Sequence, residues 1–145
     1  MAKTSVNSKF SIQHLEFSEP PLPRTGGRLM TPSGELAQII SDETIRHVAY
    51  IEFKPDGKPR GNHYHATMNH AVYVIQGKLR VTLLDLDDMS RTEVNLVSGD
   101  IIRIKPNCVH VFVAQEYSQA LELNDTAYDP ADTIPYIVPS ESGKE

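Results

Sequence analysis

From residue 36 onward, the sequence is a series of short runs rich in β-branched and aromatic residues, each closed by turn-forming residues. Clusters such as Ser98-Gly99-Asp100 end these runs. Strands that recur every ~8–12 residues are typical of an all-β sandwich or barrel, and no helical periodicity persists beyond two turns. We therefore predict strands within residues 36–40, 45–53, 69–75, 78–86, 92–97, 101–104, 109–114 and 118–124.

The remaining segments flank this series. Residues 1–30 form an N-terminal arm that we predict to be partly irregular, because Pro20-Pro21-Leu22-Pro23 permits only extended or turn backbone. Apolar residues at positions 10–17 are able to form a short strand there, which a second subunit can pair with. We predict one domain at residues 31–138, with its proline-punctuated C-terminal part wrapped around the barrel, and a disordered tail at residues 139–145.

Composition excludes several classes of partner. The net charge is −5 and basic residues form no cluster longer than a pair, so a nucleic acid is not expected, since phosphate backbones require a basic stripe. No apolar run approaches the ~20 residues of a membrane span, and the first residues lack the apolar middle of a secretory signal. The single cysteine, Cys108, fits a reducing compartment. We expect a cytoplasmic protein whose partner is a small molecule.

Four of the six histidines stand in two strand-like segments, at His63, His65, His70 and His110. The first three fit the pattern G-x5-H-x-H-x4-H-x6-G, which begins at Gly57 and ends at Gly77. The fourth ends a segment that begins at Gly99. Because residues two apart in a strand share a face, His63 and His65 are expected to point the same way. Imidazole is the commonest protein metal ligand, so the pattern predicts a metal site inside the barrel.

These two segments resemble the two motifs of the cupin superfamily. The resemblance implies an all-β, single-domain cupin, which is a double-stranded β-helix or jelly-roll barrel, over most of residues 36–124, with the N-terminal arm before it. It also implies that His63, His65, His70 and His110 bind a divalent transition metal. Zinc, iron, nickel, copper and cobalt all suit nitrogen ligands. Asn107 stands where the motif has glycine, and asparagine tolerates left-handed backbone.

His70 is the departure that bears on chemistry, because the cupin motif normally has a glutamate at this position. Four neutral imidazoles leave the ion its full double charge, so such a site is expected to be a strong Lewis acid. A six-coordinate ion would keep two positions free for substrate, whereas a tetrahedral zinc would have none. His70 has two other possible roles, as a residue supporting the ligands from behind or as a general base.

A more specific resemblance involves residues 60–65, which read Arg-Gly-Asn-His-Tyr-His. The segment is similar to the R-G-x-H-x-H stretch of cupins that act on nucleotide-linked sugars, including dTDP-sugar 3,4-ketoisomerases and dTDP-4-dehydrorhamnose 3,5-epimerases. The resemblance implies that Arg60 contacts a diphosphate and that His63 or His65 moves protons at carbon. Ketoisomerases of this kind often work without a metal, which conflicts with a four-histidine metal site.

Three functions follow from these observations. The first is an isomerase or epimerase that acts on a sugar or sugar nucleotide, with His63, His65 and Arg60 as catalytic residues. The second is a metal-dependent dioxygenase of a small chelating substrate, and the third is a non-catalytic ligand-binding cupin. We also expect a homodimer, since cupins commonly pair through their sheets. The two remaining histidines are expected outside the site, with His47 structural and His14 at the surface or an interface.

Overall fold

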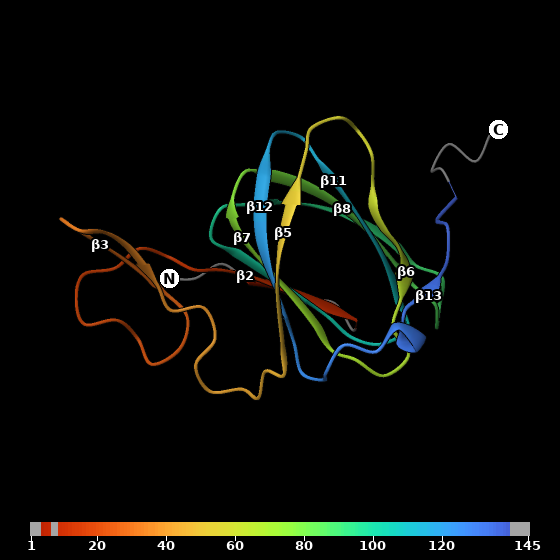
Figure 1. The fold of residues 1–145 in the computed structure, drawn as a ribbon, viewed down its shortest axis with the longest axis horizontal. Helices are drawn as coiled ribbons and strands as arrows, with labels where there is room; N and C mark the ends of the chain where they lie inside the picture. The colour runs from red at the N-terminus through yellow and green to blue at the C-terminus, as the bar shows by residue number, and fades with distance from the viewer. Residues whose placement is uncertain (1–3, 7–8, 140–145) are drawn as a thin grey trace.

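The chain folds into two antiparallel β-sheets that face each other across a hydrophobic interior (Figure 1). The computed structural model describes residues 4–6 and 9–139. The six-stranded sheet has the order β1 (Thr4–Val6), β2 (Phe10–His14), β10 (Asp100–Ile104), β7 (His70–Gln76), β12 (Ser118–Asn124) and β5 (His47–Phe53). The five-stranded sheet has the order β13 (Ile134–Pro135), β6 (Arg60–Tyr64), β11 (Cys108–Ala114), β8 (Lys78–Asp85) and β9 (Arg91–Val97). The predicted all-β sandwich or barrel is confirmed.

The main core lies between the two sheets. Val72 and Val74 of β7 point into it from one sheet, and Leu79, Val81 and Leu83 of β8 point into it from the other. Each of these side chains is almost fully buried. The period of two expected of half-buried strands therefore decides which side chains make the core.

A second apolar cluster covers the outer face of the six-stranded sheet. Ala71 and Tyr73 of β7 pack there with Ile101 of β10 and with Leu15, which follows β2. The segment that precedes β5 lies over this cluster through Ile39 and its neighbours. Strand β7 is consequently buried on both faces at its first five residues, which explains its unbroken apolar sequence.

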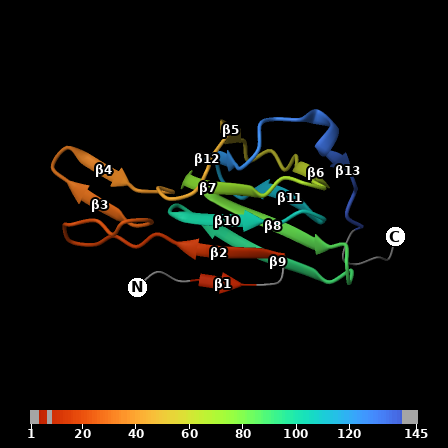
Figure 2. The same ribbon diagram turned by 90° about the horizontal axis from the view of Figure 1, so that it is seen from below.

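A hairpin of β3 (Arg28–Thr31) and β4 (Gly34–Ala37) projects from the end of the molecule opposite β6 and β13 (Figure 2). The buried guanidinium of Arg28 attaches it to the barrel, because its Nε donates to the Leu15 carbonyl at 2.7 Å. The hairpin strand ends at residue 37, so the strand predicted at 36–40 is displaced. Residues 39 and 40 pack on the sheet instead of extending the strand.

Backbone conformations at the motif turns agree with the sequence. Gly57 and Gly77 adopt positive φ angles of 82° and 107°, and Asn107 does so at 64°, as the motif substitution predicted. The C-terminal segment forms a 3₁₀ turn, η1 (Pro130–Asp132), and then pairs as β13 with β6. The predicted tail lies outside the described residues from position 140 onward. No helix in the described ranges is long and apolar enough to cross a bilayer.

Candidate metal centre

The four motif histidines meet inside the barrel, although they come from both sheets. His63 of β6 lies directly opposite His110 of β11 in the strand register, and His65 follows the end of β6. His70 begins β7 in the facing sheet. The ring centroids of His63 and His110 are 4.8 Å apart, and those of His70 and His110 are 5.0 Å apart. The imidazoles predicted to converge therefore do so.

Three of these histidines form the tightest group. One ring nitrogen each from His63, His65 and His110 lies within 4.8 Å of the others. His70 is outside this trio, although its ring centroid is 5.3 Å from that of His65. The geometry thus separates a compact set of three donors from a fourth imidazole beside it.

Backbone carbonyls fix the tautomers of two members of the trio. Nδ1 of His65 donates to the carbonyl of Asp132 at 3.0 Å, and Nδ1 of His110 donates to the carbonyl of Cys108 at 3.1 Å. Because a carbonyl only accepts, each Nδ1 carries the hydrogen and each Nε2 presents a lone pair. Both Nε2 atoms are buried and have no hydrogen-bond partner among the described residues.

This arrangement fits a metal ion. Buried polar atoms almost always have a partner, and two facing lone pairs repel each other unless a cation or a donor lies between them. Metal-binding histidines usually donate their second nitrogen to a carbonyl or carboxylate, as His65 and His110 do here. The donor set is imidazole nitrogen, which suits zinc, iron, nickel, copper or cobalt rather than calcium or magnesium.

Burial keeps these imidazoles neutral and able to coordinate. It lowers the pKa of His110 well below the ordinary value, and the neighbouring histidine rings lower it further. Burial also lowers the pKa of His63, and that of His70 to about 4, despite the opposing effect of the Glu122 carboxylate. At neutral pH, His63, His70 and His110 are therefore uncharged.

His70 differs from the trio in its hydrogen-bond partners. Its Nδ1 donates to Oδ1 of Asn124 at 2.8 Å and lies 3.3 Å from Oε2 of Glu122. The ring is only 5% exposed. A carboxylate and an amide oxygen behind Nδ1 leave Nε2 as the unprotonated nitrogen, so His70 also offers a lone pair.

A pocket of about 250 Å³ opens next to the trio. His63 and His65 form part of its wall, Glu122 and Asn124 of β12 form another part, and the segment after β12 closes it. Lining residues from that segment are Thr126, Ala127, Tyr128, Asp129, Asp132 and Thr133. The pocket is large enough for a small ligand beside the histidines.

Asp132 connects the C-terminal segment to the centre. Its carboxylate accepts hydrogen bonds from the backbone amides of Ala66, Thr67 and Met68 at 2.8, 3.0 and 3.0 Å. Its carbonyl holds the His65 ring. The loop between His65 and His70 is therefore shaped by a residue more than 60 positions away.

Sequence reasoning missed Glu122, Asn124 and Asp132. Glu122 and Asn124 share the inward face of β12 with the buried Ala120, and a polar side chain on the inward face of a predicted strand is a usable signal. Asp132 has no local signal, because its partners are distant in sequence.

Arg60 lies apart from the histidine pocket. It is the first residue of β6 and is exposed, and its guanidinium carbon lies 5.7 Å from the centre of the Phe53 ring. Its Nη2 reaches the carbonyl of Glu52 at 3.5 Å. The described lining of the histidine pocket includes no lysine or arginine.

The other singled-out residues have structural partners. Nε2 of His47 lies 3.5 Å from Oε1 of Glu122, and Nδ1 of His14 contacts the Asp100 carboxylate at 2.7 Å. Cys108 is buried, and burial raises the pKa of its thiol to about 12, so it is no nucleophile at neutral pH.

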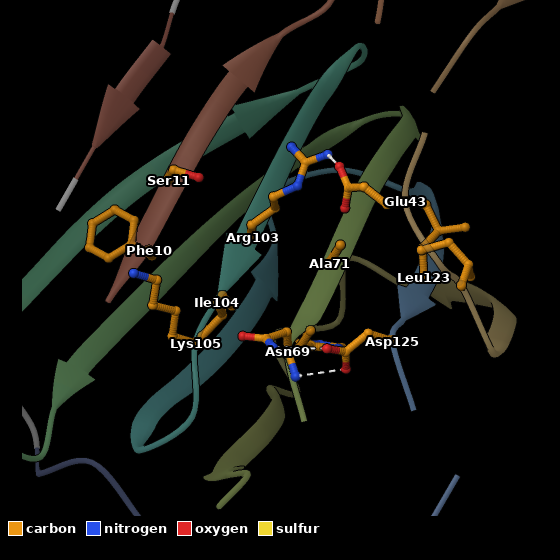
Figure 3. Close-up of a pocket in the computed structure, with 12 residues that line it drawn as sticks. Phe10, Ser11, Glu43, Asn69, Ala71, Arg103, Ile104, Lys105, Leu123 and Asp125 are labelled. Carbon is orange, nitrogen blue, oxygen red and sulfur yellow. Dashed lines mark hydrogen bonds and ion pairs between the residues drawn. The ribbon is translucent and has the colours of Figure 1, made fainter. Parts of the chain in front are cut away.

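A larger cavity of about 400 Å³ lies on the outer face of the six-stranded sheet (Figure 3). Arg103 and Glu43 form an ion pair of 2.6 Å across it, and the Asn69 amide binds the Asp125 carboxylate at 2.8 Å. The remaining lining is mainly apolar. Arg103 and Glu43 pair with each other, and of the two pockets it is the smaller one, lined by His63 and His65, that lies beside the histidine trio.

The fold and the histidine cluster together define a class: antiparallel β-barrels that carry a histidine cluster beside a pocket. The cupin domain family matches residues 49–123, which is more than half of the chain. The chain belongs to the cupin family, as its two motifs predicted. No curated protein matches the sequence.

Solved structures with the same fold include enzymes of sugar-nucleotide metabolism. A sugar 3,4-ketoisomerase from Thermoanaerobacterium thermosaccharolyticum, in complex with TDP, is 19% identical with a TM-score of 0.69, covering 89% of this chain and 89% of that one. A 3,4-ketoisomerase from Helicobacter canadensis is 19% identical with a TM-score of 0.68, covering 86% and 89%. The dTDP-4-dehydrorhamnose 3,5-epimerase from Sulfolobus tokodaii is 14% identical with a TM-score of 0.72, covering 91% and 80%. At these identities the similarity establishes the shared fold.

Proposed function

We propose that this cupin binds a divalent transition metal through His63, His65 and His110, with His70 as a fourth imidazole. The observation that carries the proposal is the pair of buried Nε2 atoms on His65 and His110, which have no partner within the described part of the chain. Each is aimed by a carbonyl behind the ring. This is the arrangement that protein metal sites use to orient a histidine ligand.

We further propose that the pocket beside this centre is an active site for proton transfer on a sugar or sugar nucleotide. A bound metal would supply Lewis-acid stabilisation of negative charge that develops on a substrate oxygen. The chain itself positions the substrate against His63 and His65. Since Nδ1 of His65 donates to the Asp132 carbonyl and its Nε2 would bind the ion, the general base for a proton next to a carbonyl would be His63, through the nitrogen that does not bind the ion. The similar structures, described as 3,4-ketoisomerases and an epimerase, support this substrate class.

Arg60 keeps its proposed role as the contact for a diphosphate. Because the described lining of the histidine pocket includes no lysine or arginine, a diphosphate held by Arg60 binds outside that pocket. A nucleotide-linked sugar would then place its sugar and its diphosphate in separate positions. This requirement distinguishes a nucleotide-linked substrate from a free sugar.

The metal is tested by elemental analysis of purified protein after dialysis against each candidate ion. One metal per chain is expected in the wild type, and His65→Ala is expected to lose it. His14→Ala, which removes a histidine outside the centre, serves as the matched control. Wild-type protein that retains no metal from any of the five ions would refute the centre.

The substrate class is tested by thermal shift with a TDP-sugar. We expect TDP-4-keto-6-deoxyglucose to raise the melting temperature and Arg60→Ala to abolish the increase, because Arg60 is the proposed diphosphate contact. Glu93→Gln provides a control at a surface position of β9. A shift that is equal for wild type and Arg60→Ala would exclude the proposed diphosphate contact.

The all-nitrogen trio also favours a second function, a metal-dependent dioxygenase of a small chelating substrate. Iron accepts imidazole ligands, and three protein ligands leave coordination positions open. Oxygen uptake that depends on substrate, and that iron but not zinc restores, would select this function over proton transfer.

We propose a homodimer as the assembled state. The edge strand β5 pairs only with β12 among the described strands, and it exposes Val48 and Tyr50 at 61% and 55% on its outer face. An edge strand with exposed apolar residues can pair with, or pack against, the same surface of a second chain. Light scattering is expected to give twice the chain mass for the wild type, and a monomer would refute the proposal.

A further inference from the structure

Glu122 occupies an unusual position for a carboxylate, between two histidines. It lies on β12, and its side chain is 23% exposed. Oε2 is 3.3 Å from Nδ1 of the buried His70, and Oε1 is 3.5 Å from Nε2 of His47 on β5. The carboxylate therefore links the histidine at the start of β7 to the edge strand of the sheet.

The other acidic residues of the pocket are engaged differently. The Asp132 carboxylate accepts hydrogen bonds from three backbone amides of the loop after His65, and the Asp129 carboxylate accepts one from the Ala131 amide at the start of the 3₁₀ turn. Of the three carboxylates in the described pocket lining, only that of Glu122 lies beside imidazole rings. Its charge acts on the histidine cluster, whereas the other two hold backbone.

Charge balance gives this contact a consequence for the metal centre. Four neutral imidazoles leave a divalent ion with two uncompensated charges in a buried site, which is unfavourable. A histidine that donates to a carboxylate becomes a better electron donor at its other nitrogen, and such partners strengthen metal binding. In His70 the Nδ1 hydrogen is donated to Asn124, and the Glu122 carboxylate, 3.3 Å from the same nitrogen, adds its negative charge behind the ring.

We propose that Glu122 is the charge-balancing carboxylate of this metal centre, acting on the ion through His70 as a positioning residue. The inference rests on the proposed metal site. It places the negative charge on β12, behind the histidine at position 70, rather than at position 70 itself.

His47 and Tyr128 hold the carboxylate in this orientation. The His47 ring faces Glu122 through Nε2 and stacks against Tyr128, with ring centroids 5.9 Å apart and an interplanar angle of 29°. A carboxylate with imidazoles on two sides has fewer accessible rotamers than one with a single partner. The histidine expected to be only structural therefore supports Glu122.

The test compares the affinity for Co²⁺ of wild type and Glu122→Gln by competition with a chelator, and records the Co²⁺ absorption spectrum of each. Loss of a carboxylate behind a ligand typically weakens metal binding about 10–100-fold, and we expect that loss with an altered spectrum and an unchanged stoichiometry. Glu122→Asp, which retains the charge, is expected to recover part of the affinity. Asp129→Asn removes a charge from the same pocket without a histidine contact and is expected to have little effect.

The outcomes separate this inference from the metal site itself. If wild type binds no Co²⁺, the proposed centre fails and the role of Glu122 fails with it. If wild type binds but Glu122→Gln has the same affinity and spectrum, only the role of Glu122 is overturned. Equal weakening by Asp129→Asn also overturns it, because the effect is then the summed charge of the pocket. In a His70→Gln background, the further effect of Glu122→Gln is expected to disappear, since the two residues act as one unit.

Discussion

Replacing Asp132 by alanine tests whether the C-terminal segment builds the centre. The substitution removes the acceptor of three backbone amides, those of Ala66, Thr67 and Met68. Hydrogen bonds to a charged group contribute about 1.5–3 kcal/mol each where water is excluded. Asp132 is only half-buried, so water replaces part of this, and we expect a total loss of about 2–3 kcal/mol rather than the sum.

Urea denaturation of metal-free protein measures this loss, because the contacts belong to the fold and not to the ion. A loss of this size is expected to lower the melting temperature by about 5–10 °C in a domain of this length. Asp132→Asn keeps one acceptor oxygen and is expected to lose less. Asp56→Asn, which affects a single turn contact with the Lys58 amide at 3.0 Å, is the matched control.

Metal affinity provides the second readout for Asp132→Ala. The carbonyl that orients His65 remains in the variant, but the loop that follows His65 loses its attachment, so the imidazole is less well oriented. We expect weaker metal binding together with lower stability. A loss of stability below about 0.5 kcal/mol, the range of an ordinary surface substitution, would refute the reasoning.

Three further predictions follow from the geometry. Burial lowers the pKa of His70 to about 4 and that of His110 well below its usual range, so below pH 6.5 the unfolded chain binds more protons than the folded one. Metal-free protein should therefore lose stability as the pH falls from about 6.5 to 4, and urea midpoints that stay constant over this range would contradict the prediction. Gly61→Ala places a Cβ 2.4 Å from the His110 carbonyl oxygen at a φ of 113°, so strand β6 must move away from β11. We expect the free energy of unfolding to fall by more than about 2 kcal/mol and metal binding to weaken, and wild-type values of both would show that the strands tolerate the shift. Leu83→Ala removes a core side chain that is 1% exposed, so it should lower the free energy of unfolding by about 2–5 kcal/mol and leave the metal stoichiometry unchanged. A loss of metal in this variant would contradict the expectation that core packing and metal binding are independent.

Local patterning explains how much of the fold was predictable. Alternation along strands such as β8 and β11 determines which side chains face the core, and turn residues such as Asn107 determine where strands end. The hairpin of β3 and β4 was missed because its position depends on the packing of Arg28 against Leu15 and Gly99, contacts that leave no periodic trace.

The histidine cluster was predictable for the same reason, and its surroundings were not. His63 and His110 lie opposite each other in paired strands, so spacing and alternation suffice to bring them together. Arg60 is close to them in sequence, yet it is absent from the pocket lining, because β6 carries it away from His63 along the strand. Residues that are neighbours in the sequence motif therefore do not all line the same pocket.

The partners of the cluster show where sequence information is weak or strong. Asp132 reaches its amides across more than 60 residues, and the only hint in the sequence is a proline-punctuated segment. Glu122 is different, because it lies two residues after the buried Ala120 in a strand that the sequence predicts. An acidic residue on the inward face of a strand is costly unless a partner compensates it, and its presence predicts such a partner. When a histidine takes the place of the motif glutamate at position 70, the strand paired with β7 is therefore where the balancing charge is to be sought.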